Sequence, residues 1–531
     1  MNFAAQFFYS HSKNRASRRR SGVEEEYDPF WQSNGKHGSS SHQGSQRCVS
    51  KCPQSRSVRN GGISPRPTPI HPERLKDFGE EEYLNGDVRT WEMKIIGSPE
   101  TQLGDMADSQ KRQEFKSGIK IPGEYIRFED ISAAAFKIQG GVQKTPCVYS
   151  RLSKQYGMEI YVKKEHLQYT GTVKERGVLY LLMSLRQDQQ KKGVIVASDS
   201  NFSMAVAYHG SELRIPVFVI MAASTSPTRL KICREYGAMV ISYGSTPMDS
   251  QSHARRLAQE NGYLYLEEEE SSIYLAGLGT MGLEMYEQIP RLDAVILPAG
   301  GLCGLLAGTA AALKQLNPNI TIIGVEPEDF PLLQQSIKLG YPVKDFHSNP
   351  NRKLYGDLVG PPFGNNTYQI AKKLVDKVVA VREEDVLVSM LRIQEYERVL
   401  VDTEGAIGLA AVISGKLPEL RGKRVAIAVC SANMELPLIR HCVDRALAID
   451  DRVGKFSVQL GEGPGDVGKL LDLLARQDAR LLDISLERPS TMSDLFNIQV
   501  SCTVETRDKL QSAQLRNALM ERYTALCWQE R

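Results

Sequence analysis

The stretch that decides the fold is Lys164-Glu165-His166-Leu167-Gln168-Tyr169-Thr170-Gly171-Thr172-Val173-Lys174-Glu175-Arg176-Gly177. A β-branched run at 160–162 leads into it, and the apolar pattern of 178–183 predicts that a helix continues beyond it. Lys174 therefore lies at a helix N-terminus, where the helix dipole favours anions over cations. Positive potential and partial burial both favour the uncharged amine, so this placement indicates a reactive lysine. A solvated lysine on the first helical turn is the alternative.

Outward from this stretch, residues 119–450 alternate short apolar runs with helical patterns. Strands are expected at 193–198, 217–221, 239–243, 294–297 and 425–429, and a helix over 229–236 is expected to end at Gly237. Apolar strands separated by helices indicate parallel sheets covered on both faces. Ligand sites in such sheets lie at the carboxyl ends of the strands. We therefore expect an α/β fold with its site in the segments that follow strands.

Three polar segments follow expected strands. Gly300, Gly301 and Gly304 come after the strand at 294–297 and precede an alanine-rich helix. Backbone N–H groups at such a helix start bind phosphate, and glycines allow it to approach. Ser198-Asp199-Ser200-Asn201-Phe202 follows the strand at 193–198, and Cys430-Ser431-Ala432-Asn433 follows the strand at 425–429. Taken alone, the former is a turn and Cys430 a small core residue.

Together these segments resemble the motifs of the fold-type II pyridoxal-phosphate enzymes, most closely the serine/threonine dehydratase (ammonia-lyase) branch. The resemblance covers roughly 125–450 and implies a two-lobed α/β fold with parallel sheets. It implies that Lys174 carries pyridoxal 5′-phosphate and that Gly300, Gly301 and Gly304 bind the phosphate. Asn201 would contact the phenolic oxygen of the cofactor.

The same resemblance places Ser198 at the carboxylate of a small amino-acid substrate and Cys430 at the pyridine nitrogen. A thiol cannot hold that nitrogen protonated as a carboxylate does, so the ring is a weaker electron sink. Loss of the α-proton together with a β-hydroxyl is then favoured. The expected reaction is β-elimination of L-threonine or L-serine to an α-keto acid and ammonia.

Several positions depart from the family pattern and keep two other functions open. Small or polar family residues are replaced at Ser200, Phe202, Leu302 and Leu358, which also fits a weakened or inactive protein with a binding or regulatory role. Asp199 stands where racemases of the family have a serine that acts as a second base, so an amino-acid racemase is the other alternative. An acidic Asp199 would oppose the substrate carboxylate.

No divalent-cation site is assigned from the sequence. Glu326, in Ile323-Gly324-Val325-Glu326-Pro327, resembles a family glutamate that binds such an ion, but Leu332 stands where its partner aspartate would be. A hard cation needs several oxygen ligands.

The two ends of the chain differ from this central part. Residues 451–531 predict a βαββαβ order that resembles the ACT-like domain of many threonine dehydratases, which implies an amino-acid effector or a role in assembly, and hence a homo-oligomer. Residues 1–118 are low in apolar periodicity and predict a disordered extension. Their first 23 residues lack acids and carry one lysine and four arginines, the pattern of a mitochondrial leader.

Composition excludes other classes. The formal net charge of +3, without a dense basic stripe in the folded part, argues against nucleic acid as a partner. No apolar run reaches the roughly 18 residues that a membrane helix needs. Nine cysteines, several in apolar segments, favour reduced thiols inside a cell. A cytoplasmic location is expected, with the mitochondrion as the alternative.

Overall fold

The computed structural model describes residues 126–268, 271–343, 352–359, 363–461, 463–488 and 497–529. The predicted N-terminal extension, 1–118, and its leader lie outside the described residues. Within the described ranges no helix combines the length and apolarity that crossing a bilayer requires. The cysteines in these ranges are free thiols.

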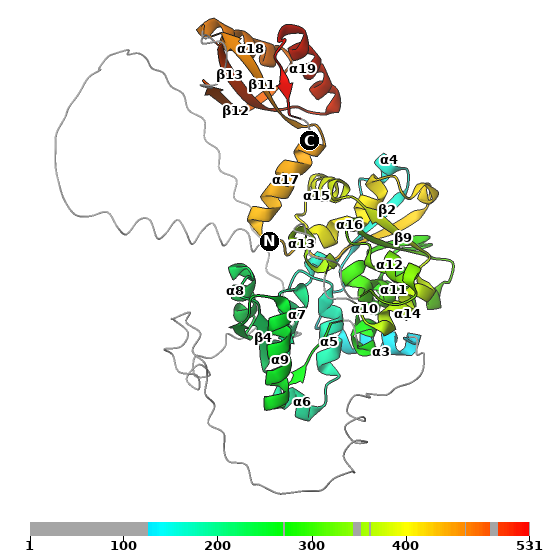
Figure 1. Cartoon of the computed structure of the whole chain (residues 1–531). Coiled ribbons are helices and arrows are strands. Elements are labelled where there is room, and N and C mark those ends of the chain that lie inside the picture. The colour runs from blue at the N-terminus through cyan, green and yellow to red at the C-terminus, as the bar shows by residue number, and fades with distance from the viewer. Residues whose placement is uncertain are drawn as a thin grey trace, which may run out of the picture. The chain divides into compact units, whose positions relative to one another are not determined.

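A six-stranded sheet forms the larger lobe, in the order β1-β2-β10-β7-β8-β9 (Figure 1). β1 is antiparallel to β2, and the other neighbours are parallel. Its strands are β1 (Cys147–Tyr149), β2 (Glu159–Lys164), β7 (Ala294–Pro298), β8 (Thr321–Pro327), β9 (Lys377–Val381) and β10 (Arg424–Val429). Val429 pairs with Lys164, so β2 and β10 end at the same edge of the sheet. The segments that follow these strands therefore start side by side.

Helices cover both faces of this sheet because its strands are apolar on both sides. In β7, Val295 and Leu297 belong to one core, and Ala294 and Ile296 to the other. The first core is shared with α3 (Phe128–Ile138), α5 (Lys174–Met183), α10 (Ser272–Gln288), α11 (Cys303–Leu316) and α14 (Asn365–Leu374). The second is shared with α15 (Glu383–Glu397), α16 (Thr403–Ile413) and α17 (Leu436–Ile449).

Short elements connect these strands and helices. They are α4 (Ser153–Tyr156), η3 (Glu165–Leu167), η4 (Gly300–Leu302), α12 (Leu332–Leu339), α13 (Arg352–Tyr355), η5 (Gly356–Val359) and η6 (Pro418–Leu420). Among them, η3 and η4 lead from strand ends toward α5 and α11, the two helices whose starts matter for the site.

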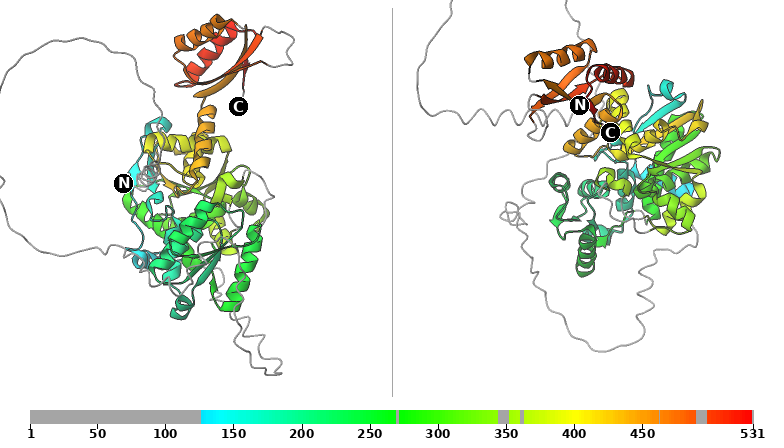
Figure 2. Two further views of the ribbon diagram at one scale, coloured as in Figure 1. Left: turned by 90° about the vertical axis from the view of Figure 1, so that its left-hand side faces the viewer. Right: turned by 45° about the horizontal axis from the view of Figure 1, so that its top comes forward.

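A parallel four-stranded sheet, β5-β4-β3-β6, forms the smaller lobe. It comprises β3 (Val194–Ala197), β4 (Val217–Met221), β5 (Met239–Ser242) and β6 (Leu264–Tyr265). Its helices are α6 (Gln187–Lys192), α7 (Asn201–Glu212), α8 (Pro227–Glu235) and α9 (Pro247–Asn261). α7 shares the first core, and Ala254 and Ala258 of α9 cover the other face. This lobe is a separate group in Figure 1 and in the right-hand view of Figure 2.

The predicted strands and the helix at α8 are confirmed, with ends that differ by at most two residues. The α/β class with parallel sheets is confirmed as well.

The last six elements run in the predicted βαββαβ order. They are β11 (Val453–Gly461), α18 (Pro464–Arg476), β12 (Arg480–Glu487), β13 (Asn497–Glu505), α19 (Lys509–Arg522) and β14 (Cys527–Trp528). Their antiparallel sheet, β12-β13-β11-β14, has a core of its own that includes Phe456, Val458, Val500 and Leu515. The resemblance to an ACT-like domain, and the boundaries at 118 and 450, stay predictions.

Candidate active site

Lys174 is the first residue of α5, and it is buried, with 1% of its surface exposed. The loop before it is held to the segment after β10. The Val173 N–H donates to the Cys430 carbonyl at 2.9 Å, and the Ala432 N–H donates to the Gly171 carbonyl at 3.2 Å. Gly171 has a φ of +72°, which favours glycine. The end of β10 therefore fixes the position of the lysine.

The Lys174 amine lies against a carboxylate that sequence reasoning missed. Its Nζ is 2.5 Å from Oε1 of Glu268, and both side chains are buried. Glu268 follows β6 and also receives hydrogen bonds from the hydroxyls of Ser200, at 3.5 Å, and Tyr274, at 3.4 Å. The acidic run 267–270 resembles a solvated loop, so its sequence carries no signal of this contact.

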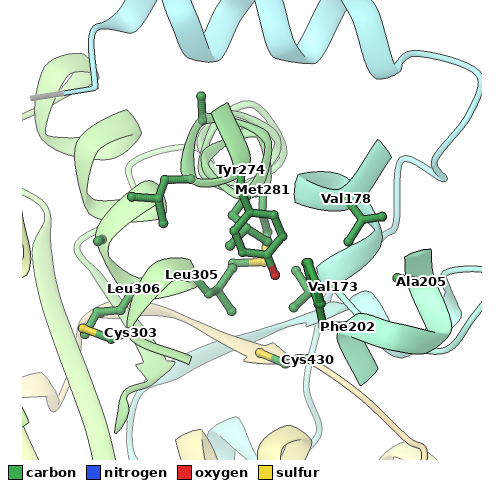
Figure 3. Packing of buried hydrophobic residues seen from close by; sticks show 14 of the residues in the cluster. Val173, Val178, Phe202, Ala205, Tyr274, Met281, Cys303, Leu305, Leu306 and Cys430 are labelled. Atoms are coloured by element: carbon green, nitrogen blue, oxygen red, sulfur yellow. The ribbon is translucent and has the colours of Figure 1, made fainter. Parts of the chain in front are cut away.

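Cys430 is fully buried beside Lys174. It belongs to the same apolar cluster as Val173, Phe202, Tyr274 and Cys303 (Figure 3). Burial, and next the nearby Glu404 carboxylate, raise the pKa of the Cys430 thiol well above its usual value, while the charge of Lys174 opposes this shift. Cys430 is therefore a neutral thiol at physiological pH, as its predicted role requires.

A network of polar side chains joins the two lobes next to these residues. The Asn433 amide donates to the Asn201 Oδ1 at 3.0 Å, and the Asn201 amide donates to Glu404 at 3.4 Å. Ser431 donates to Glu404 at 3.0 Å and to Asp402. The structure thus brings Asn201 from α7 together with the segment after Cys430.

Arg229 of α8 is a second residue that sequence reasoning missed. Its guanidinium donates to Asn201 Oδ1 at 3.2 Å and to the Asn433 carbonyl at 3.5 Å. The side chain is half-buried, so it supplies a positive charge between the lobes. The expected helix over 229–236 gave no indication of which side this arginine would face.

Ser198 and Asp199 lie at the end of β3. Ser198 is half-buried, and its hydroxyl accepts from the Ser200 N–H at 3.0 Å. Asp199 is exposed, whereas Ser200 is buried and caps α7 by accepting from the Phe202 N–H. The expectation that the charge of Asp199 opposes the substrate carboxylate stays a prediction.

The glycine segment forms the start of α11. Gly300 has a φ of +73°, and a Cβ added to it would lie 2.6 Å from the Leu358 carbonyl oxygen. Gly301 belongs to the same short helix, η4, and Gly304 to the first turn of α11. Leu358 thus covers the glycine turn, which explains why a bulkier residue than glycine would not fit at position 300.

These surroundings fit pyridoxal phosphate. A buried lysine, a neutral thiol at the end of β10 and a glycine turn at the start of a 14-residue helix all lie where parallel strands end. The start of α11 suits a phosphate, because the positive end of a helix dipole favours an anion and the glycines before it allow close approach.

Two buried ionic groups lie outside this arrangement. Glu326 accepts from the N–H groups of Leu333 and Gln334 at 2.9 and 3.0 Å, and burial raises its pKa to about 7. Within the described residues no cluster of metal-ligating side chains is present. The second group is Glu165 of η3, which pairs with Arg176 of α5. Burial would raise the pKa of Glu165, but the Arg176 guanidinium outweighs burial and lowers this pKa to about 2. This ion pair anchors α5.

The comparisons with known proteins agree with this geometry. A model of the pyridoxal-phosphate dependent enzymes matches residues 138–431. L-threonine ammonia-lyase of Thermotoga maritima is 30% identical over 74% of this chain and 97% of its own. The processed form of threonine deaminase isoform 2 from Solanum lycopersicum has a TM-score of 0.56 and 25% identity, covering 66% of this chain and 99% of its own. Maize serine racemase has the same TM-score and 27% identity, covering 61% and 98%.

The match spans more than half of the chain and includes Lys174, the glycine turn and Cys430. The predicted family and cofactor are thereby confirmed. The chain belongs to the pyridoxal-phosphate dependent enzymes.

Proposed function

We propose that the protein is an ammonia-lyase that converts L-threonine or L-serine to an α-keto acid and ammonia. The observation that carries this proposal is the neutral, fully buried thiol of Cys430 beside Lys174. Bound pyridoxal phosphate withdraws electrons from the α-carbon of an amino acid, and a thiol at its ring nitrogen limits that withdrawal. Elimination of a β-hydroxyl then competes well with reactions that need a long-lived carbanion.

In this proposal the residues of the chain divide the remaining work. Lys174 holds the cofactor and, once released, takes the α-proton of the substrate. Gly300, Gly301 and Gly304 hold the phosphate through backbone N–H groups. Asn201 orients the cofactor through its side-chain amide, which Asn433 already fixes.

Substrate binding falls to the loop between β3 and α7. Ser198 and the first N–H groups of α7 suit a carboxylate, because a helix N-terminus attracts anions. Arg229 adds a positive charge near Asn201. We include it in the carboxylate site for that reason.

The test is a coupled keto-acid assay on protein supplied with cofactor. L-serine should yield pyruvate and L-threonine 2-oxobutyrate, and Lys174→Ala should abolish both the activity and the covalent fixation of cofactor by borohydride. A racemase would instead produce D-serine, which chiral chromatography detects. Cofactor fixed on Lys174 without any turnover would support the inactive alternative.

We also propose that the segment from Val453 onward is an ACT-like domain that binds an amino-acid effector and mediates homo-oligomer formation. A hollow of about 600 Å³ supports the effector, and it is lined by Gly463, Pro464, Val467, Leu486, Arg488 and Ile498. Arg488 suits a carboxylate there. Leu482 and Leu486 of the edge strand β12 are exposed, which supports assembly through this sheet.

Two variants test this second proposal. The effector is first sought by adding L-amino acids singly to the full chain and measuring its thermal unfolding temperature. Arg488→Gln should remove the rise in this temperature that the effector causes. Arg480→Gln serves as the matched control. Truncation after residue 450 should lower the oligomeric state, which light scattering measures as a molecular mass close to that of one truncated chain. The truncated protein should still bind the cofactor. An unchanged thermal response and an unchanged assembly would refute it.

A further inference from the structure

Glu268 is a buried carboxylate at the reactive lysine that the proposed reaction does not yet use. Its side chain is 5% exposed, and its Oε1 lies 2.5 Å from the Lys174 Nζ. The hydroxyls of Ser200 and Tyr274 donate to its two oxygens. A buried carboxylate costs free energy unless it is paired and hydrogen-bonded, and here it is both.

The support of Glu268 comes from positions where the chain departs from the family pattern. Ser200 is one of these positions, and its hydroxyl contacts the carboxylate. Phe202 is another, and its ring packs edge-on against the Tyr274 ring, with centroids 5.5 Å apart. These departures therefore belong to one arrangement around the carboxylate.

Tyr274 is seated closely in this arrangement. A Cβ at Gly177, one turn after Lys174 in α5, would lie 2.5 Å from two atoms of the Tyr274 ring. Figure 3 shows the ring between α10 and the side chains of Val173 and Phe202, with its hydroxyl directed toward them. The position of the hydroxyl that meets Glu268 is thus set by packing.

We propose that Glu268 is a catalytic residue that favours the protonated form of the Lys174 nitrogen, both while it is bonded to the cofactor and after the released amine has taken the α-proton of the substrate. This rests on the assignment of Lys174 as the cofactor lysine under the proposed function. An opposite charge in a buried place favours the charged form of the nitrogen.

Protonation of this nitrogen prepares the exchange of lysine for substrate. The nitrogen of the incoming amino acid would replace Nζ at the carbon that Lys174 occupies, and one proton would pass from the incoming nitrogen to Nζ. Lys174 would then be released as a neutral amine, which can take the α-proton. Glu268 would pair the charge that Lys174 gains in that step.

The other ionisable groups around this space have partners of their own. At the start of α16, its N-cap Asp402 accepts from the Gly405 N–H, and Glu404 accepts from Ser431. From η3, Glu165 pairs with Arg176, whose side chain belongs to α5. The Cys430 thiol at the end of β10 stays neutral. The charges of these groups should therefore stay the same when Glu268 alone is changed.

The experiment is a pH titration of the visible absorbance of the cofactor-loaded protein. Glu268→Gln should lower the midpoint by about 1–3 pH units, because an opposite charge at this distance shifts a pKa by that much. Tyr274→Phe should lower it less. Glu267→Gln is the matched control: Glu267 is a partly exposed neighbour paired with Arg255, and its removal should leave the midpoint unchanged.

A second measurement decides the matter if the variant does not hold cofactor or if the band does not titrate. The cofactor-free protein is treated with an amine-acylating reagent over a pH series, and mass spectrometry follows the peptide that contains Lys174. Its labelling midpoint should also fall in Glu268→Gln. Equal midpoints in wild type and Glu268→Gln overturn the proposal.

This result is separate from that of the keto-acid assay. A protein without turnover but with a shifted midpoint refutes the ammonia-lyase and keeps the role of Glu268. Turnover with unchanged midpoints supports the ammonia-lyase and refutes the role of Glu268.

Discussion

The two sides of the site differ in how far they keep the family pattern. The predicted cofactor side, made by Lys174, the glycine turn and Cys430, keeps residues of the expected kind at the ends of parallel strands. The predicted substrate side, from Ser198 to Phe202, is altered at three of five positions, and one of the altered residues, Ser200, contacts Glu268. The difference teaches that substitutions that look like decay in a sequence can be parts of one replacement structure.

The largest expected effect tests whether the two sides are independent. Phe202→Ala should lower the free energy of unfolding by about 3–5 kcal/mol, since its ring is fully buried against Tyr274. Chemical denaturation measures this. The variant should still fix cofactor on Lys174 after borohydride reduction. Loss of fixation in protein that is still folded would break the comparison.

A second change, at Glu326 in the larger lobe, tests how the stability of the protein depends on pH. Burial raises the pKa of Glu326 to about 7, so its protonated form is favoured by folding. The contribution to stability is full below the unfolded pKa near 4.5 and is lost as pH rises through 7. Glu326→Gln should remove this decrease in the free energy of unfolding, which the size of the pKa shift puts at roughly 3 kcal/mol.

Urea unfolding at pH 4.5 and pH 8 measures the Glu326 effect, as the difference between wild type and variant. A parallel pH dependence in both proteins would contradict it. Cofactor fixation should be the same in both.

The glycine turn gives the next effect. Gly300→Ala should weaken the binding of cofactor at least tenfold, about 1.4 kcal/mol, because φ is +73° and the added Cβ would meet the Leu358 carbonyl. Gly340→Ala is the matched control, with a φ of +86° and nothing within 4 Å of its Cβ. Equal affinities in the two variants would show that backbone strain alone, and not the phosphate turn, is being measured.

The smallest effect is expected at Asp199. Its side chain is exposed in the loop proposed to bind the substrate carboxylate, and exposed charge interactions contribute about 0–1 kcal/mol, so Asp199→Ala should raise kcat/KM for L-serine by no more than about fivefold. A fall in kcat/KM would contradict this expectation. Formation of D-serine that disappears in this variant would favour the racemase.

Sequence patterns predicted the parts of the fold that depend on local periodicity. The strands β3, β4, β5, β7 and β10 and the start of α5 were found because apolar runs and glycines mark them. Lys174 and Cys430 were singled out by the resemblance of their segments to family motifs, and their individual roles stay predictions. Glu268 and Arg229 could not be found this way, since a loop glutamate and a helical arginine acquire their partners only when the two lobes pack.

The hydrogen bonds between Gly171–Val173 and Cys430–Ala432 join segments about 260 residues apart in the chain. Closing so large a loop is costly in entropy, and non-local contacts of this kind slow folding. We therefore expect the lysine to reach its final position only after β10 has been added between β2 and β7. On refolding, the ability to capture pyridoxal phosphate should return after most of the helical signal, which makes the cofactor a reporter of the last step of assembly.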